Sequence, residues 1–237
     1  IYFAGNSSID FRKDTLLKFS DSIEECLSGL VPDEIDSDEF SVCEQILIWG
    51  GNRDARKGAT PQLKYLVSKN ELLQYLERAK IIFEGDTIST DNITTNVKFA
   101  GSMWTKIYAL NSVSGTPIYD TRVAAAICTL LAIFRHETKS WTSKGSLLNF
   151  SVSTREKKRS RFTLPNSDVI SFSFLQNNSA EWTENTLKLS WIIESVISKR
   201  PLLFGNEKNM KTKKHAFEAC LFMLGYDTEN LKIETNI

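Results

Sequence analysis

Hydrophobic residues recur at spacings of three and four along most of the chain, which is typical of helices that bury one face. This spacing, together with one apolar run, predicts helices over residues 15–30, 40–49, 72–83, 182–198 and 211–224. Ser68 and Glu71 have the spacing of a capping box, and Gly50 and Gly225 stand where helices are expected to end. The pattern predicts a mostly α-helical protein.

Two more helices are predicted in the middle of the chain, and they carry its most informative side chains. Pro117 ends the preceding element, and Asp120 stands at the N-cap of an alanine-rich helix over residues 121–131. Lys106 lies upstream on a short helix. A turn between the helices can place this amine opposite the carboxylate. Such a pair suits attack on a polarised carbon, with the amine as nucleophile and the carboxylate as base or counter-charge.

The segments between these helices are less regular. Residues 51–61 and 86–95 are predicted to be polar connections, and residues 141–179 to be loops with one strand over 169–174. Turn-forming residues are frequent in these segments, and the helical spacing is absent from them.

The composition is that of an ordinary globular protein, with 41% hydrophobic and 24% charged residues in a chain of 237. Basic and acidic residues both number 29, whereas nucleic-acid-binding proteins are often basic. The charge is segregated along the chain, because residues 33–44 are acidic while residues 155–161 and 208–214 are basic. A basic surface for DNA is therefore compatible with zero net charge.

Cysteine and histidine usage argues against a metal or cofactor. The four cysteines are far apart, so an iron–sulfur cluster is not expected, and two histidines are too few for a zinc site. Cys128 and Cys220 lie on apolar helical faces and are expected to be buried free thiols in a reducing compartment. With no signal peptide and no membrane-spanning run recognised, the expected location is the cytoplasm, or the nucleoid in a prokaryote.

The segment around Lys106 and Asp120 resembles a known family. Thr105-Lys106, a helix, and then Pro117-Ile-Tyr-Asp-Thr-Arg-Val123 are similar to the catalytic segment of the helix-hairpin-helix DNA glycosylases, especially the small prokaryotic 8-oxoguanine-glycosylase-like branch. Residues 182–191 and 218–227 are also similar to segments of that branch.

Three features depart from the family pattern. Residues 99–104 read Phe-Ala-Gly-Ser-Met-Trp where the family has a Leu-Pro-Gly-x-Gly hairpin. The spacing from Lys106 to Asp120 is shorter than usual, and Arg122 stands where histidine is common.

The resemblance implies a two-lobed helical fold with a DNA-binding groove between the lobes. The whole chain, residues 1–237, would be a single unit that acts as a monomer on double-stranded DNA. One lobe would comprise approximately residues 1–50 and 180–237, and the other, approximately residues 60–140, would carry the catalytic helix pair.

The implied activity is cleavage of the bond between a base and its sugar. A base inside a duplex must first be flipped into a pocket. Asp120 would then stabilise the positive charge that develops on the sugar. Lys106 would attack C1′ and form a Schiff base if its amine is neutral, or would hold phosphate if it stays protonated, in which case the reaction stops at an abasic site.

Further site residues fall into two groups. Candidates for the base pocket or a wedge are Trp104, Trp49, Asn52 and Tyr119. Candidates for binding DNA phosphates are Arg53, Arg122, Lys157, Lys158, Arg159 and Arg161. Each has a structural alternative: the aromatic residues suit a core, and the basic run suits a solvated loop.

Two substrate classes and one rival function remain open. The family default is a damaged purine such as 8-oxoguanine, and the alternative is a hypermodified base of phage DNA, removed as antiviral defence. The rival function is a non-catalytic helical module that binds DNA or protein, in which Asp120 only caps its helix. A zinc nucleobase deaminase is excluded because the H-x-E and P-C-x-x-C motifs are missing.

Overall fold

The computed structural model describes residues 32–52, 54–138, 149–153, 173–175 and 178–226, together with Thr228 and Leu231. These residues are mostly helical, as the sequence predicts. The helices are α2 (Pro32–Trp49), α3 (Ala59–Ser68), α4 (Leu72–Phe83), α5 (Thr90–Asn96), α6 (Trp104–Asn111), α7 (Thr121–Thr138), α8 (Ser179–Lys199) and α9 (Met210–Leu224). The predicted helix over residues 15–30 lies outside the described residues.

Two short strands, β1 (Ser151–Ser153) and β2 (Ser173–Leu175), pair in parallel with Val152 opposite Phe174. Residues 173 and 174 of the strand expected over residues 169–174 belong to β2, and residues 169–172 lie outside the described residues. Strand β1 lies in a segment that was expected to be loop. The phenol of Tyr119 donates a hydrogen bond to the carbonyl oxygen of Ser151 over 2.8 Å, which ties β1 to the segment just before α7.

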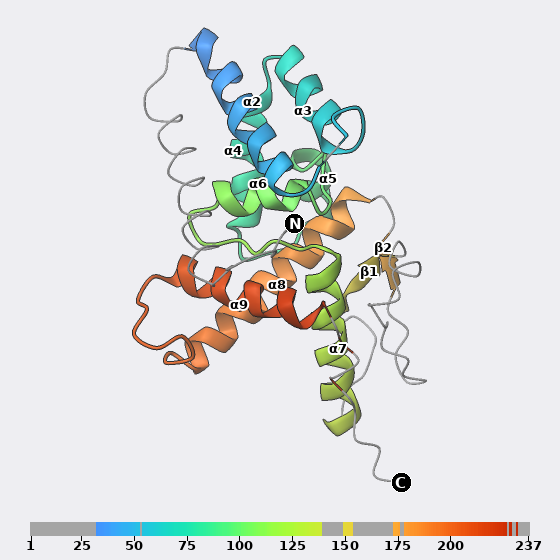
Figure 1. Cartoon of the computed structure of the whole chain (residues 1–237), viewed down its shortest axis with the longest axis vertical. Coiled ribbons are helices and arrows are strands. Elements are labelled where there is room, and N and C mark those ends of the chain that lie inside the picture. Colours follow the sequence, from blue (N-terminus) through green and yellow to red (C-terminus); the bar gives the residue numbers. More distant parts are fainter. Residues whose placement is uncertain are drawn as a thin grey trace.

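The described helices form two hydrophobic cores. In Figure 1, α2 to α6 lie in the upper part of the molecule and α7 and α9 in the lower part. The upper core contains Ile46 of α2 and Leu72 of α4, and the lower core contains Val123 of α7 and Leu221 of α9. Helix α8 contributes Leu187 to the upper core and Leu189 to the lower one, so it joins the two.

These cores do not follow the division of the chain that the family resemblance implied. Helix α2 was expected to lie with the C-terminal helices, but its buried stripe of Cys43, Ile46 and Leu47 belongs to the core of α3, α4 and α6. Helix α7 was expected to lie with α3 to α6, but it packs against α9 and β1.

Three further local predictions were wrong. Residues 86–95 were expected to be a polar connection, but Thr90–Asn96 form α5. Ser68 and Glu71 do not form a capping box, because Ser68 is the last residue of α3 and its hydroxyl donates to the carbonyl oxygen of Tyr65 over 2.8 Å. Asn70 reverses the chain with a φ of 56°, and Glu71 makes no side-chain capping bond. Cys220 is exposed rather than buried, whereas Cys128 is a buried free thiol.

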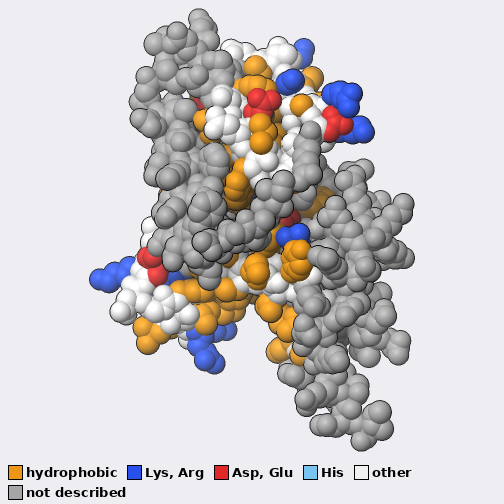
Figure 2. Space-filling model, in the orientation of Figure 1, with side chains coloured by type: hydrophobic (Ala, Val, Ile, Leu, Met, Phe, Trp, Pro, Cys, Tyr) orange, Lys and Arg blue, Asp and Glu red, His pale blue; other side chains and the backbone are white. Residues whose placement is uncertain are grey.

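On the face drawn in Figure 2, most lysines and arginines of the described residues lie at the upper right, beside acidic side chains, and along the lower edge. Exposed apolar side chains include Leu202 and Leu203, which follow α8, and Met223 of α9. None of the described helices is both long and apolar enough to cross a membrane.

Candidate functional site at the starts of α6 and α7

Lys106 lies in the first turn of α6, a helix whose residues are all buried. Its side chain is only 4% exposed, and its Nζ donates a hydrogen bond to the carbonyl oxygen of Ser102 over 2.7 Å. The lysine stem passes against Gly50, where an added Cβ would lie 2.7 Å from Lys106 Cδ. The end of α2 and the loop before α6 therefore enclose the amine.

Asp120 caps α7, as the sequence predicts. Its Oδ1 accepts hydrogen bonds from the backbone N–H groups of Arg122 and Val123, both at 3.0 Å, which satisfies two of the free donors at the start of the helix. Among the described residues, no hydrogen bond to its Oδ2 is present. The cap thus uses one carboxylate oxygen, Oδ1, and does not use the other, Oδ2.

A hydrogen bond joins the two helix starts. The hydroxyl of Thr105 donates to the carbonyl oxygen of Tyr119 over 3.1 Å. Thr105 precedes Lys106 and Tyr119 precedes Asp120, so this bond holds the backbones of the two candidate catalytic residues beside each other. Within the described part of the chain, Lys106 and Asp120 do not form an ion pair with one another.

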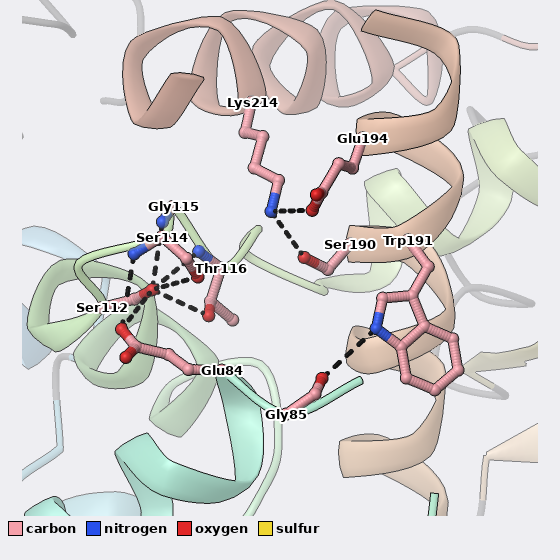
Figure 3. Close-up of polar contacts among 10 residues, drawn as sticks. All are labelled: Glu84, Gly85, Ser112, Ser114, Gly115, Thr116, Ser190, Trp191, Glu194 and Lys214. Carbon is pink, nitrogen blue, oxygen red and sulfur yellow. Dashed lines mark hydrogen bonds and ion pairs between the residues drawn. The ribbon is translucent and has the colours of Figure 1, made fainter. Parts of the chain in front are cut away.

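The short connection between α6 and α7 is held by Glu84, at the end of α4 (Figure 3). Glu84 Oε1 accepts hydrogen bonds from the N–H of Val113 over 2.7 Å and the N–H of Ser114 over 3.4 Å. The hydroxyl oxygen of Ser112 accepts from the N–H of Gly115 over 3.1 Å and the N–H of Thr116 over 3.0 Å. This network fixes the path of the chain that leads to Asp120.

Helix α9 and its C-terminal cap pack closely against Gly115, before α7, and against Arg122, in the first turn of α7. Gly115 has a φ of 83°, and an added Cβ would lie 2.8 Å from Lys211 Cα. At the other end of α9, a Cβ on Gly225 would lie 1.8 Å from the carbonyl oxygen of Arg122. Only glycine permits these two close approaches, so α9 fixes the position of α7 at the start of the helix.

Arg122 is stacked on two aromatic rings beside Asp120. Its guanidinium carbon lies 4.6 Å from the ring centroid of Phe222 and 4.6 Å from that of Tyr226. The side chain is half-buried, and the stacking restricts its conformations. A partly exposed and oriented cation therefore lies two residues after the candidate carboxylate.

Polar contacts hold α8 against its neighbours (Figure 3). Lys214 of α9 is 2% exposed, and its Nζ contacts Glu194 Oε2 at 2.8 Å and Ser190 Oγ at 3.3 Å. The indole N–H of Trp191 donates to the carbonyl oxygen of Gly85 over 3.3 Å. These contacts connect α8 to α9 and to the end of α4, the helix that supplies Glu84.

The aromatic candidates are placed in the interior. Trp104 is 2% exposed and donates its indole N–H to Gln62 Oε1 over 2.5 Å, so it anchors α6 and does not reach a base in this arrangement. Tyr119 is fully buried, and burial raises the pKa of its phenol well above the usual value. Trp49 is half-buried and packs against the upper core. For Trp104 and Tyr119 the structural alternative is the one observed.

Among the remaining polar candidates, the structure describes Asn52 only. Asn52 donates its amide N–H to Thr60 Oγ1 over 2.7 Å, which closes the loop between α2 and α3. The remaining phosphate-binding candidates lie outside the described residues: Arg53, Lys157, Lys158, Arg159 and Arg161.

Sequence reasoning missed the residues that position the pair. The Glu84 carboxylate binds backbone N–H groups, and Ser102 binds Lys106 through its backbone carbonyl oxygen. Contacts with the backbone do not depend on a recognisable sequence motif. Thr105 belongs to the resemblance, but nothing in the sequence indicates that its hydroxyl reaches Tyr119. Comparisons with known protein families, with curated proteins and with solved structures give no match to this chain.

Proposed function

We propose that the protein is a DNA N-glycosylase of the helix-hairpin-helix type, in which Asp120 and Lys106 act on the sugar of a flipped nucleotide. The observation that best supports this proposal is the 3.1 Å bond between Thr105 and Tyr119, because it joins the helix starts that carry the two residues. A lysine is rarely buried to 4% exposure without a specific reason, since removing its charge from water is costly.

Cleavage begins with extrusion of the target nucleotide, at a cost of a few kcal/mol. The C1′–N bond then breaks, its electron pair leaves with the base, and positive charge develops on the sugar. Asp120 Oδ2 stabilises that charge while Oδ1 holds the cap. A fixed carboxylate of this kind needs no reorganisation during the reaction.

The protonation state of Lys106 determines the next step of the reaction. As a neutral amine it attacks C1′, the base departs with the bonding electrons and a proton, and the sugar ring opens to a Schiff base. As an ammonium it instead holds a phosphate, and water adds to C1′ and gives one proton to the departing base, which leaves an abasic site.

Double-stranded DNA is the proposed partner, bound by a monomer in a groove between the α2–α6 group and the α7–α9 group. Arg122 suits contact with a phosphate, because Phe222 and Tyr226 orient its guanidinium. The basic segment over residues 155–161 supplies further phosphate contacts in this proposal.

The proposed substrate is a damaged or modified base. 8-Oxoguanine is the default by resemblance. Residues 99–104 depart from the family hairpin, and residues 51–61 are polar. Both features suit a base pocket of different shape that accepts hypermodified bases of phage DNA, which would make the protein an antiviral enzyme.

One observation favours the non-catalytic alternative. Oδ1 of Asp120 makes the two hydrogen bonds expected of an ordinary N-cap, and a cap alone gives sufficient reason for an aspartate at this position. A helical module that binds DNA or protein without cutting a glycosidic bond would have the same contacts.

Base release distinguishes the two functions. Wild type, Asp120→Asn and Lys106→Gln are incubated with duplexes that contain 8-oxoguanine and with modified phage DNAs, and released bases are measured by mass spectrometry. Release by wild type that is lost in Asp120→Asn supports the glycosylase. Binding of these DNAs with no released base supports the non-catalytic module.

A further inference from the structure

Four aromatic rings form a stack that runs through the upper core, and we call it the aromatic column. Its members are Phe83, Tyr108, Trp104 and Phe99. Neighbouring ring centroids lie 4.7, 5.7 and 5.7 Å apart in that order, with interplanar angles of 32°, 26° and 19°. Trp104 is two residues before Lys106, so the column passes the start of the candidate catalytic helix.

One end of the column reaches the surface. Phe83, Trp104 and Tyr108 are at most 3% exposed, whereas Phe99 is partly exposed. The exposed Lys98 holds its Nζ 5.7 Å from the Phe99 centroid and 5.0 Å from the centroid of Tyr65. Tyr65 is 42% exposed and meets Phe99 edge to face, with centroids 6.5 Å apart.

The backbone around this end is held firmly. The N–H of Phe99 donates to the hydroxyl of Tyr75 over 2.9 Å, and the carbonyl oxygen of Phe99 accepts from the hydroxyls of Tyr75 and Tyr108. Ser179 Oγ accepts from the N–H of Ala100 over 3.1 Å and donates to the carbonyl oxygen of Lys98 over 3.0 Å. The backbone that carries Lys98 and Phe99 is therefore held by hydrogen bonds on both sides of the Phe99 ring.

We propose that Tyr65, Lys98 and Phe99 form a binding site for one unstacked nucleobase of a DNA strand and its phosphate. Every nucleobase has a flat face that stacks on aromatic rings, so such a site needs no particular sequence. The base would extend the aromatic column, and the Lys98 ammonium would move from the rings to the phosphate. This inference rests on the proposed function, because it takes DNA as the partner.

The site would serve the reaction by holding DNA that has been opened. Extruding one nucleotide leaves neighbouring bases partly unstacked, and a rigid aromatic surface next to the loop of Lys106 offers them a new stacking partner. Trp104 was one of the aromatic residues that the sequence suggested for contact with bases, and this proposal gives a base contact to Tyr65 and Phe99, at the exposed end of the column.

The test uses the full chain and two matched pairs of variants. Tyr65→Leu removes the ring, whereas Tyr65→Phe keeps it. Lys98→Met removes the cation over the rings, whereas Lys64→Met removes an exposed lysine of α3 for which no ring contact or ion pair is present among the described residues. The probe is a fluorescein-labelled single-stranded 12-mer, and affinity is measured by anisotropy at several salt concentrations.

The expected result is about tenfold weaker binding for Tyr65→Leu and near wild-type binding for Tyr65→Phe. Lys98→Met should reduce the slope of log affinity against log salt by about 0.7. In wild type with dimethylated lysines, the Lys98 methyl NMR signal should be displaced by the rings and should return towards the ordinary position when the 12-mer is added.

Equal affinities for Tyr65→Leu and Tyr65→Phe, together with an unmoved Lys98 signal, would overturn the site. Equal losses in Lys98→Met and Lys64→Met would overturn it too, since they indicate general charge attraction. Base release measured on the same proteins separates the two proposals. If bases are released but the Tyr65 and Lys98 variants bind like their controls, only the nucleobase site is wrong. If these variants bind more weakly but no base is released, only the glycosylase proposal is wrong.

Discussion

The hydroxyl of Thr105 donates a hydrogen bond to the carbonyl oxygen of Tyr119 over 3.1 Å, and the next residue on each side is a candidate for catalysis. The same hydroxyl lies 3.4 Å from the carbonyl oxygen of Ser102, the group that accepts from Lys106 Nζ. A single side chain thus connects the backbone before Asp120 with the loop that holds the lysine.

Thr105→Val should weaken both stability and activity. The valine keeps the shape of threonine but leaves the buried carbonyl oxygen of Tyr119 without this donor, which costs about 1–3 kcal/mol. Urea unfolding measures the loss, and base release should fall at the same time. Thr105→Ser restores the hydroxyl and is expected to recover most of both. A stable but equally impaired Thr105→Ser would show that the hydrogen bond is not what matters.

Gly50→Ala should displace Lys106 without unfolding the protein. The added Cβ would lie 2.7 Å from Lys106 Cδ, so the lysine side chain must move. A shift of about 1 Å in a catalytic group can cost roughly 100-fold in rate, so base release should fall strongly.

Gly85→Ala is the matched control for Gly50, because Gly85 also follows the end of a helix and its added Cβ meets only backbone oxygens, the nearer at 3.3 Å. Rates and urea unfolding curves are compared for the two variants. Equal rates would contradict a positioning role for Gly50.

Asp120 variants should separate the cap from the charge. Asparagine and serine cap helices about as well as aspartate, so Asp120→Asn and Asp120→Ser should keep most of the stability, while Asp120→Ala should lose about 1 kcal/mol. Thermal unfolding measures this order. If Asn and Ser destabilise as much as Ala, the charge of Asp120 contributes to folding itself.

Stability should fall at high pH because of buried phenols. Burial raises the pKa of Tyr75 from its usual 10.0 to about 12, against an opposing effect of its hydrogen bond with Tyr108. The unfolded chain therefore loses this proton at a lower pH than the folded protein. The contribution is fully present below pH 10 and declines as pH rises towards 12.

The slope should approach about 1.4 kcal/mol per pH unit for each such tyrosine. Burial raises the pKa of Tyr108 and Tyr119 in the same direction, so they add to the decline. Urea unfolding from pH 9 to 11 measures the slope, and Tyr75→Phe should make it shallower. An unchanged slope in Tyr75→Phe would contradict a buried, protonated phenol.

Much of the helical structure could be predicted from the chain. Apolar spacing indicated α8 and α9, Gly225 gave the end of α9, and Asp120 gave the start of α7. These signals are local, so one sequence is enough to read them. Helix α5 was missed because its Thr and Asn residues are weak helix formers, and their side chains instead bond to backbone carbonyls within the helix.

The arrangement of the site could not be predicted in the same way. Trp104 looked equally suited to the rim and to the core, because α6 is buried all round and has no polar face to orient it. The grouping of α2 with α4 and α6 depends on packing between distant segments. The hydrogen bonds from Thr105 and to Glu84 join residues whose proximity follows only from that packing.

Asp120 is proposed to supply negative charge for the breaking of a glycosidic bond, and one comparison tests this role most directly. Base release by wild type and by Asp120→Asn is timed on the same modified duplexes, since asparagine keeps the cap and removes the charge. The proposal predicts release by wild type and a loss of at least about 100-fold in Asp120→Asn. Equal rates in the two proteins, or DNA binding without any released base, would contradict it.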